Sequence, residues 1–401
     1  MMLRKKIAIL TLSVGAGHVR AAEEIQRALA DREDHTEARL LDAVELGSAW
    51  FRRLYVEPYW WMLRRTPGVW RRLFERRQRK RHRSTAPRWL FRYGCRGLLD
   101  ELKAFAPHLV ISTEIGAAET AAVGKRGGWS NTPVLAVVTD FQSEPPWVQR
   151  EIDFYCVATD ESRSQLIGWG VSPNRVLVCG IPIDPAFALA YDKPGLMKSM
   201  GLAEGRPVVL VMGGGMGPVP LDEIILNLER CRLPLQALVV TGRNEQMKAQ
   251  AESLRGKVAV GLRVLGWSDN VPELMAVADL LITKPGGLTT AEAMAMGLPM
   301  VLTHPIPGPE ERNLDYLTRN GVALAAPTLR EIPDLALRIL SGDSERREMA
   351  RRARELARPD AAHAVAQVAR ALLEQGSYIE LLAYPPTRSD DSAYVMFLGP
   401  L

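Results

Sequence analysis

Residues 283–299 (TKPGGLTTAEAMAMGLP) carry residue types that suit the binding of a phosphorylated ligand. Gly286 and Gly287 are expected to let the backbone come close to that ligand, because glycine has no Cβ. Thr289 and Thr290 are expected to cap the helix that follows. The free N–H groups and the positive dipole end of such a helix suit a diphosphate. The segment therefore predicts a diphosphate site at the start of a helix.

Glu292 is expected in the first turn of the same helix. There its carboxylate can accept hydrogen bonds from both hydroxyls of a ribose. The alternative is a carboxylate that only complements the helix dipole, which is worth about 0.3–1 kcal/mol. A nucleoside diphosphate is therefore one interpretation of the segment, and a simple helix start is the other.

Two more glycine-rich turns follow short apolar runs. Residues 13–18 (SVGAGH) follow the run 6–12, and residues 213–217 (GGGMG) follow the run 207–212. Neither turn has the GxGxxG spacing of dinucleotide-binding proteins, and the sequence has no GxxxxGK[ST] motif, so NAD and P-loop sites are not supported. Each turn is followed by a helical pattern. Strand, glycine turn and helix at the head of each half predict two doubly wound α/β domains.

Further apolar runs extend this organisation through both halves. They are expected to be buried parallel strands, at residues 109–113, 133–139, 154–158, 235–241, 264–265, 280–283 and 299–303. The Pro- and Gly-rich stretch 180–194 is the expected linker. This gives an N-terminal domain of residues 1–191, a C-terminal domain of residues 192–376 and an extension of residues 377–401.

Length and composition fit a two-domain protein. The chain has 401 residues, of which 47% are hydrophobic, and domains of about 150–200 residues each would account for it. The four cysteines form no CxxC pair, which favours a reduced, cytosolic setting. No apolar run approaches the ~20 residues needed to cross a bilayer. The basic, apolar start runs directly into a glycine turn, which favours a buried first strand over a signal peptide.

The run KPGGLTTAEAMAMGLPMVLTHPIPGPEERNLDYL, at 284–317, closely resembles the nucleotide-sugar site of a known enzyme family. That family is glycosyltransferase family 28, with the monogalactosyldiacylglycerol synthases and the processive diacylglycerol glucosyltransferases. The resemblance extends through SVGAGHVRAAEEI, VVTDF, CGIPIDPAF, VVLVMGGGMG and VVTGRN, up to about residue 372. It implies the GT-B architecture, in which two Rossmann-like domains face each other across a cleft. It also implies inverting transfer of a hexose from a UDP-hexose to diacylglycerol or a related lipid, without a metal or another cofactor.

The resemblance also assigns residues to the donor site. Glu292 corresponds to the glutamate that binds the ribose. The pyrophosphate cradle corresponds to Gly286, Gly287, Leu288 and Thr289. The same cleft is expected to be lined from the other side by Gly17, Gly213, Gly214 and Gly215. Residues near the base are Arg243, Gly266 and Trp267, and those that meet the sugar hydroxyls are Glu310, Glu311 and Asn313. Relatives often have Gln in place of Glu310, which leaves the identity of the hexose open.

His18 corresponds to the general base on the acceptor, a role that suits an imidazole titrating near neutrality. Its alternative is a helix-cap histidine at the tip of the glycine turn. Asp140 is expected to orient His18, to act itself, or only to cap a strand end. Glu114 and Glu144 stand where relatives often have His, so either glutamate is a candidate to share the base role.

Residues 59–83 explain the positive charge of the chain. They hold ten Arg and Lys residues against one acid, Glu75, with tryptophans interleaved. Aromatic and basic residues together suit the headgroup layer of an anionic membrane. A solvated basic helix and a nucleic-acid site are the alternatives, and we favour the membrane because no nucleic-acid motif surrounds the segment. The residues expected to meet the membrane or the acceptor are Asp42, Trp60, Trp61, Arg64, Arg65, Trp70, Arg71 and Arg72.

The expected protein is thus a cytoplasmic enzyme attached peripherally to the inner face of the membrane. Two other function classes stay open at this point. One is a UDP-N-acetylglucosamine-using enzyme of the same fold, either a lipid-linked transferase or a 2-epimerase. The other is a non-catalytic module that binds membranes or nucleic acid.

Overall fold

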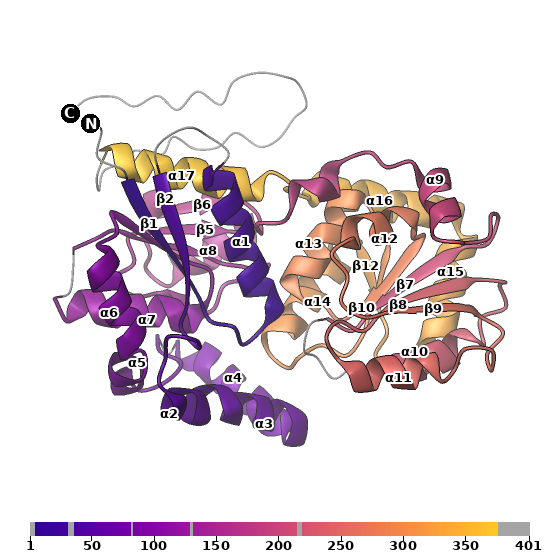
Figure 1. The fold of residues 1–401 in the computed structure, drawn as a ribbon, viewed down its shortest axis with the longest axis horizontal. Coiled ribbons are helices and arrows are strands. Elements are labelled where there is room, and N and C mark those ends of the chain that lie inside the picture. The colour runs from indigo at the N-terminus through magenta and orange to yellow at the C-terminus, as the bar shows by residue number, and fades with distance from the viewer. Residues whose placement is uncertain (1–4, 31–35, 82, 129–130, 215–218, 376–401) are drawn as a thin grey trace.

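The computed structural model describes residues 5–30, 36–81, 83–128, 131–214 and 219–375, which form two α/β lobes side by side (Figure 1). Each lobe is built on a six-stranded sheet, with the strand orders β2-β1-β3-β4-β5-β6 and β12-β11-β10-β7-β8-β9. All described strand pairs are parallel. The two doubly wound domains predicted from the apolar runs are confirmed.

The first lobe carries its sheet between two layers of helices. Its strands are β1 (Lys5–Thr11), β2 (Thr36–Asp42), β3 (Leu109–Ser112), β4 (Val134–Val137), β5 (Phe154–Val157) and β6 (Val176–Val178). Its helices are α1 (Ala16–Ala30), α2 (Ala49–Phe51), α3 (Glu57–Arg65), α4 (Pro67–Lys80), α5 (Arg88–Gly94), α6 (Arg96–Phe105), α7 (Ile115–Arg126) and α8 (Asp160–Gly168). A single π-helical turn joins α2 to α3.

The second lobe repeats this arrangement. Its strands are β7 (Val208–Met212), β8 (Gln236–Val240), β9 (Gly261–Leu265), β10 (Leu280–Thr283), β11 (Met300–Leu302) and β12 (Ala323–Ala325). The helices of this half of the chain are α9 (Lys193–Ser199), α10 (Leu221–Leu228), α11 (Glu245–Glu252), α12 (Val271–Val277), α13 (Gly287–Met296), α14 (Pro309–Arg319), α15 (Ile332–Ser341), α16 (Asp343–Leu356) and α17 (Ala361–Gln375).

Helix α17 returns to the first lobe, where Figure 1 shows it in yellow above the first sheet. Its buried Val365, Ala369 and Leu372 belong to the same apolar core as Ile7 and Ile25. The helix packs against α1, so together they cover one face of the first sheet. Residues 361–375, placed in the second domain from sequence, therefore pack on the first domain instead. The predicted extension 377–401 lies outside the described residues.

Two helix starts differ from the prediction. Helix α1 begins at Ala16, so His18 lies in its first turn and not at the tip of the preceding turn. Helix α13 begins at Gly287, with Gly286 as its N-cap. Thr289 therefore lies inside the helix, and Glu292 lies in the second turn. Thr290 does not cap either, because its hydroxyl donates backwards to the carbonyl of Gly286 at 2.7 Å.

The two lobes touch through buried and part-buried polar contacts beside these helix starts. Asn313 of α14 donates through Nδ2 to Oδ1 of Asp140 at 2.7 Å and accepts through Oδ1 from the amide of Phe141 at 3.0 Å. The ring of Phe141 stacks on Tyr316 with 5.1 Å between centroids. A Cβ on Gly287 would come within 2.1 Å of the carbonyl oxygen of Thr139. The absence of a side chain at Gly287 therefore serves the contact between the lobes.

We expect Gly287→Ala to destabilise the protein by about 1–3 kcal/mol, because the new methyl group meets backbone that cannot move away cheaply. Gly286→Ala is the matched control. Its Cβ would meet only the Lys284 ammonium at 3.4 Å and the Glu310 carboxylate at 3.6 Å, which are ends of flexible side chains. Calorimetric unfolding of both variants checks the expectation. Equal shifts of the unfolding midpoint would contradict it.

Candidate active site

Two adjoining cavities lie between the lobes, of about 450 and 140 Å³. Both are lined by Ala16, Arg20, Gly214, Leu288 and Thr289. A Cβ built on Gly17 would lie 3.5 Å from the Cβ of Leu288, so the amino ends of α1 and α13 meet where the cavities join. Two helix amino ends at one point favour a bound anion there.

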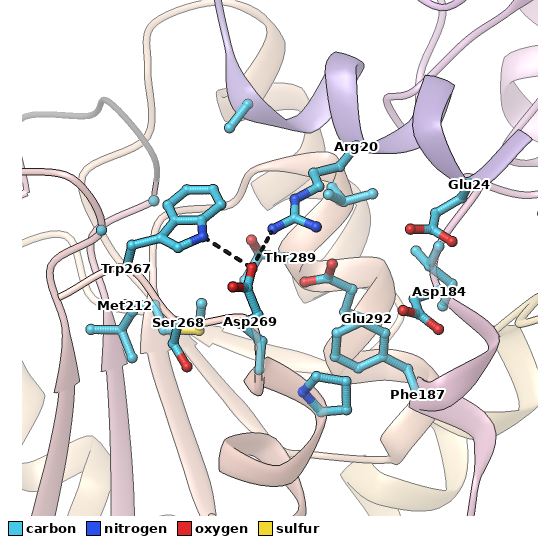
Figure 2. A pocket seen from close by; sticks show the side chains of 18 residues that line it. Arg20, Glu24, Asp184, Phe187, Met212, Trp267, Ser268, Asp269, Thr289 and Glu292 are labelled. Atoms are coloured by element: carbon cyan, nitrogen blue, oxygen red, sulfur yellow. Dashed lines mark hydrogen bonds and ion pairs between the residues drawn. The ribbon is translucent and has the colours of Figure 1, made fainter. Parts of the chain in front are cut away.

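The smaller cavity holds Glu292, which points into it from α13 (Figure 2). Burial raises the pKa of Glu292 to about 8, and Arg20 acts in the opposite direction. Trp267 lies across this cavity and donates from its indole nitrogen to Asp269 at 3.0 Å. The described lining residues include four carboxylates against one guanidinium, that of Arg20.

His18 lines the larger cavity with one ring nitrogen already engaged. Its Nδ1 lies 2.8 Å from the hydroxyl of Thr139 and 3.2 Å from the carbonyl oxygen of Thr113. A carbonyl oxygen can only accept, and the Thr139 hydroxyl itself donates to that carbonyl at 3.4 Å. These partners place the proton on Nδ1 and leave Nε2 with its lone pair. The sequence led us to expect an imidazole that titrates near neutrality, but burial lowers the pKa of His18 to about 4. The ring is therefore an unprotonated, neutral base at physiological pH.

Asp140, predicted to orient His18, lies beside it in the larger cavity but forms none of the hydrogen bonds described for the imidazole. It accepts instead from Asn313 of the other lobe. The orienting groups are the hydroxyl of Thr139 and the carbonyl of Thr113. Burial raises the pKa of Asp140.

Glu114 and Glu144, the two glutamates considered for the base role, both line the larger cavity but have different partners. Glu144 is buried and pairs with the Arg77 guanidinium at 2.6 Å. Glu114 caps α7 by accepting from the amide of Ala117 at 3.0 Å. Burial raises the pKa of Glu114 to about 8. Glu144 is thus held by a cation, whereas Glu114 carries a proton near neutrality, and a base role for either stays a prediction.

Of the three residues expected to meet the sugar, one lines the larger cavity and the other two do not. Glu310 lines the larger cavity and forms an ion pair with Lys284. Glu311 instead accepts from the amide of Gly308 at 2.9 Å, which closes the start of α14. Asn313 is fully buried and bonded at both ends of its amide. Glu311 and Asn313 were expected at the sugar because they neighbour Glu310 in the motif, but the structure uses both within the fold.

The structure also places the residues predicted near the diphosphate and the uracil base in different surroundings. Gly214 lines both cavities, and its φ of +72° is the left-handed conformation that favours glycine. Gly213 packs behind it against Leu221, and Gly215 lies outside the described residues. Gly17, Gly286, Gly287, Leu288 and Thr289 all line the larger cavity. Arg243 lies over the ring of Trp267, 4.5 Å from its centroid, and Gly266 precedes that tryptophan.

The basic segment forms α3 and α4, at the lower edge of the first lobe in Figure 1. Trp60 and Trp70 line the larger cavity, and Trp70 donates to the carbonyl of Pro307 at 2.9 Å. Arg71 pairs with Glu311 at 2.5 Å, so α4 also contacts the second lobe. Of the residues expected to meet the membrane, those with exposed side chains are Trp61, Arg64, Arg65, Arg71 and Arg72.

Asp42 was expected to touch the acceptor, yet it lines neither cavity. It accepts from the amides of Ser13 at 3.3 Å and Val44 at 2.7 Å. These bonds tie the turn after β1 to the turn after β2. Asp42, at the end of β2, therefore holds the loop that leads to His18 in place.

Functional positions that sequence reasoning missed are the ones defined by long-range contacts. Thr139 and Thr113 hold His18, and Arg20 and Lys284 line the cavities. Three of the four lie within or beside motifs that were identified, in VVTDF, SVGAGHVR and KPGG. Charged or hydroxyl side chains in those motifs were the available signal. Among the described residues there is no group of His, Cys, Asp and Glu side chains placed to hold a metal ion.

Comparison with known proteins gives matches along both halves. A family model described as monogalactosyldiacylglycerol (MGDG) synthase matches residues 18–183, and one described as glycosyl transferases group 1 matches residues 192–356. A processive diacylglycerol beta-glucosyltransferase from Bacillus cytotoxicus is 30% identical over 370 residues, which cover 91% of this chain and 93% of that protein. One from Bacillus cereus is 29% identical over 366 residues, covering 90% and 92%.

Solved structures share the fold at low identity. MurG from Acinetobacter baumannii superposes with a TM-score of 0.61 at 17% identity, covering 92% of this chain and 99% of that one. HepE from Anabaena, in complex with UDP-glucose, gives 0.56 at 13% identity, covering 92% and 100%. A UDP-GlcNAc 2-epimerase from Neisseria meningitidis gives 0.57 at 14% identity, covering 91% and 100%. At these identities the likeness shows the GT-B fold.

Proposed function

The chain belongs to the family of the monogalactosyldiacylglycerol synthases and processive diacylglycerol glucosyltransferases, and on this premise we propose the reaction that it catalyses. It transfers a hexose from a UDP-hexose to the free hydroxyl of diacylglycerol, with inversion at the anomeric carbon. The observation that carries the proposal is the position of His18. His18 lines the larger cavity with its Nε2 unprotonated, and its neighbours Ala16 and Arg20 on α1 line both this cavity and the carboxylate-bearing smaller one.

The reaction is a single displacement. The acceptor hydroxyl gives its proton to Nε2 of His18, and its oxygen attacks the anomeric carbon of the donor. The bond from that carbon to the diphosphate breaks, and its electron pair leaves with UDP. The amino end of α13, starting at Gly287, supplies N–H groups and a dipole that stabilise the charge on the leaving group. Glu292 of the same helix holds the ribose.

The lipid acceptor enters through the larger cavity. Its wall contains apolar side chains from the basic segment and its neighbours, including Leu54, Met62, Trp60 and Trp70. Leu54 is itself 57% exposed, so the apolar lining continues to the surface. This continuity suits an acyl chain that stays in the membrane while its headgroup reaches His18.

Peripheral attachment to an anionic membrane belongs to the same proposal. Exposed Trp61, Val69 and Leu73 lie on α3 and α4 among exposed arginines. Trp50 and Trp89 form a second exposed aromatic pair with 6.1 Å between ring centroids. Aromatic side chains favour the headgroup layer, and cations favour its negative charge. Among the described helices, none has the length and apolarity needed to cross a bilayer.

Removing three exposed arginines of the segment, Arg64, Arg65 and Arg72, is expected to weaken binding to anionic vesicles. Each cation near such a surface contributes about 1 kcal/mol, so the triple glutamine variant should bind on the order of 100-fold more weakly. Vesicle sedimentation measures the change. The control removes the same charge from the second lobe, at exposed Arg206, Arg232 and Arg255, and should bind like the unaltered chain. Equal losses in both variants would contradict a specific surface.

A transfer assay tests the reaction itself. The purified chain is incubated with vesicles of anionic phospholipid and diacylglycerol and a panel of UDP-sugars, and the lipids are analysed by mass spectrometry. A hexosyl-diacylglycerol formed from one donor supports the proposal. Binding of UDP without any glycosylated lipid would reject diacylglycerol as acceptor. Epimerised UDP-N-acetylglucosamine in a lipid-free reaction would favour the epimerase.

A further inference from the structure

Arg20 lies in the cleft but has no role in the reaction proposed above. It lies in the second turn of α1 and lines both cavities. Figure 2 shows its guanidinium reaching from α1 of the first lobe towards Trp267 and Asp269 of the second, with the Glu292 carboxylate close by. Of the residues that line both cavities, Arg20 is the one with a charged side chain.

The present partners of Arg20 hold it weakly. Its Nη2 lies 3.5 Å from Oδ1 of Asp269 and its Nε 3.8 Å from Glu23. The Asp269 side chain is 78% exposed, and Arg20 itself is 33% exposed. Ion pairs this long between hydrated groups stabilise little. The guanidinium also lies over the indole of Trp267, 5.2 Å from the ring centroid. This stacking contact is kept if the guanidinium shifts slightly towards a new partner.

The other cations of the larger cavity are committed to buried carboxylates. Lys284 pairs with Glu310, and Arg77 pairs with Glu144. In both pairs each side chain is at most 16% exposed. Releasing either cation would leave a buried carboxylate without its partner, which is costly. Arg20 is thus the described cation of the two cavities whose partner can be exchanged at least cost.

The donor creates the need for such a cation. Its diphosphate must enter beside a cavity that holds the carboxylates of Asp184 and Asp269 and, once the ribose is bound, the ionised form of Glu292. Helix amino ends offset part of this negative charge. A guanidinium binds phosphate oxygens through two parallel N–H groups and is not readily deprotonated, so it is a better partner for diphosphate than for a single distant carboxylate.

We propose that Arg20 binds the diphosphate of the UDP-sugar from the first lobe, giving up Asp269 for the phosphate oxygens. This inference rests on the proposed function, because it assigns a further binding residue to the same donor. Since α13 belongs to the second lobe and α1 to the first, the diphosphate then bridges the lobes. Arg20 also adds to the stabilisation of the charge that develops on the leaving UDP.

Calorimetric titration of the full chain with UDP and with uridine tests the inference. Arg20→Ala is expected to weaken UDP binding by about 10–100-fold, as for loss of a hydrogen-bonded charge pair. Uridine has no phosphate, so its affinity should change less than about 3-fold. Arg20→Lys keeps the charge and should recover part of the affinity. Arg39→Ala, also in the first lobe and paired with Glu37 and Glu101 outside the lining of both cavities, is the matched control and should bind UDP normally.

Each other outcome decides against the inference. Unchanged UDP affinity in Arg20→Ala overturns it while leaving the donor site intact. Equal losses for UDP and uridine overturn it too, because they would show that Arg20 acts through the packing of Trp267. If the alanine variant does not fold, Arg20→Gln replaces it, since glutamine keeps most of the side-chain length. Absence of UDP binding by the unaltered chain would overturn the proposed function, and this inference with it.

Discussion

Replacement of His18 by alanine is expected to slow hexose transfer by about 10²–10⁴-fold while UDP binds with unchanged affinity. The imidazole is held through Nδ1 by Thr139 and Thr113, so its loss removes a positioned base. It lines the larger cavity, whereas Glu292 lies in the smaller one. Turnover at saturating UDP-hexose gives the first quantity, and calorimetric titration with UDP gives the second.

The pH dependence of transfer distinguishes His18 from Glu114 as the base. The pKa of His18 is lowered to about 4, so the ring stays unprotonated as the pH falls from 8 to 5. Turnover limited by His18 should therefore be flat over this range. The pKa of Glu114 is raised to about 8, so a Glu114 base would gain activity only as the pH rises through 8. A rising profile, together with a larger loss in Glu114→Gln than in His18→Ala, would transfer the role to Glu114.

The strands of both sheets were predictable wherever they are buried on both faces. β3, β4 and β10 are buried throughout, and such strands appear in sequence as continuous apolar runs. β2 (TEARLLD) is mostly half-buried at a sheet edge, and β6 and β12 are edge strands of only three residues. Short or half-exposed strands carry too little apolar pattern to be separated from loops.

Side-chain roles within the identified motifs could not be predicted to the same degree. The motif around Glu310 is specific, but its members Glu311 and Asn313 are used to start α14 and to join the lobes. His18 contacts Thr139 across 121 positions of sequence, and spacing along the chain holds no information about such a contact. The return of α17 to the first lobe is equally long-range. Local pattern thus predicts the buried elements, whereas the role of each side chain inside the cleft depends on how the lobes meet.

Glu292→Ala is expected to weaken UDP binding by about 10–100-fold, because a carboxylate that accepts two ribose hydroxyls is lost. The competing interpretation, a charge that only complements the helix dipole, is weakened by the structure. Glu292 lies in the second turn of α13, and the dipole effect falls off beyond the first. UDP with a 2′,3′-dideoxyribose should bind the unaltered chain and Glu292→Ala equally. The ribose contact would be contradicted if Glu292→Ala preferred UDP over the dideoxyribose analogue as strongly as the unaltered chain does.

Protonation adds an independent check on Glu292. Burial raises its pKa to about 8, so the carboxyl of the unliganded chain holds a proton at pH 7. Accepting both ribose hydroxyls requires the ionised form. Binding of UDP should therefore release a proton below pH 8, and the affinity should rise with pH up to that value. Titrations at pH 7 in two buffers of different ionisation enthalpy measure the release. Glu292→Gln has no carboxyl proton to lose and should release none from this position. Equal proton release by this variant and by the unaltered chain would assign the proton to another group, and would contradict the contact between Glu292 and the ribose.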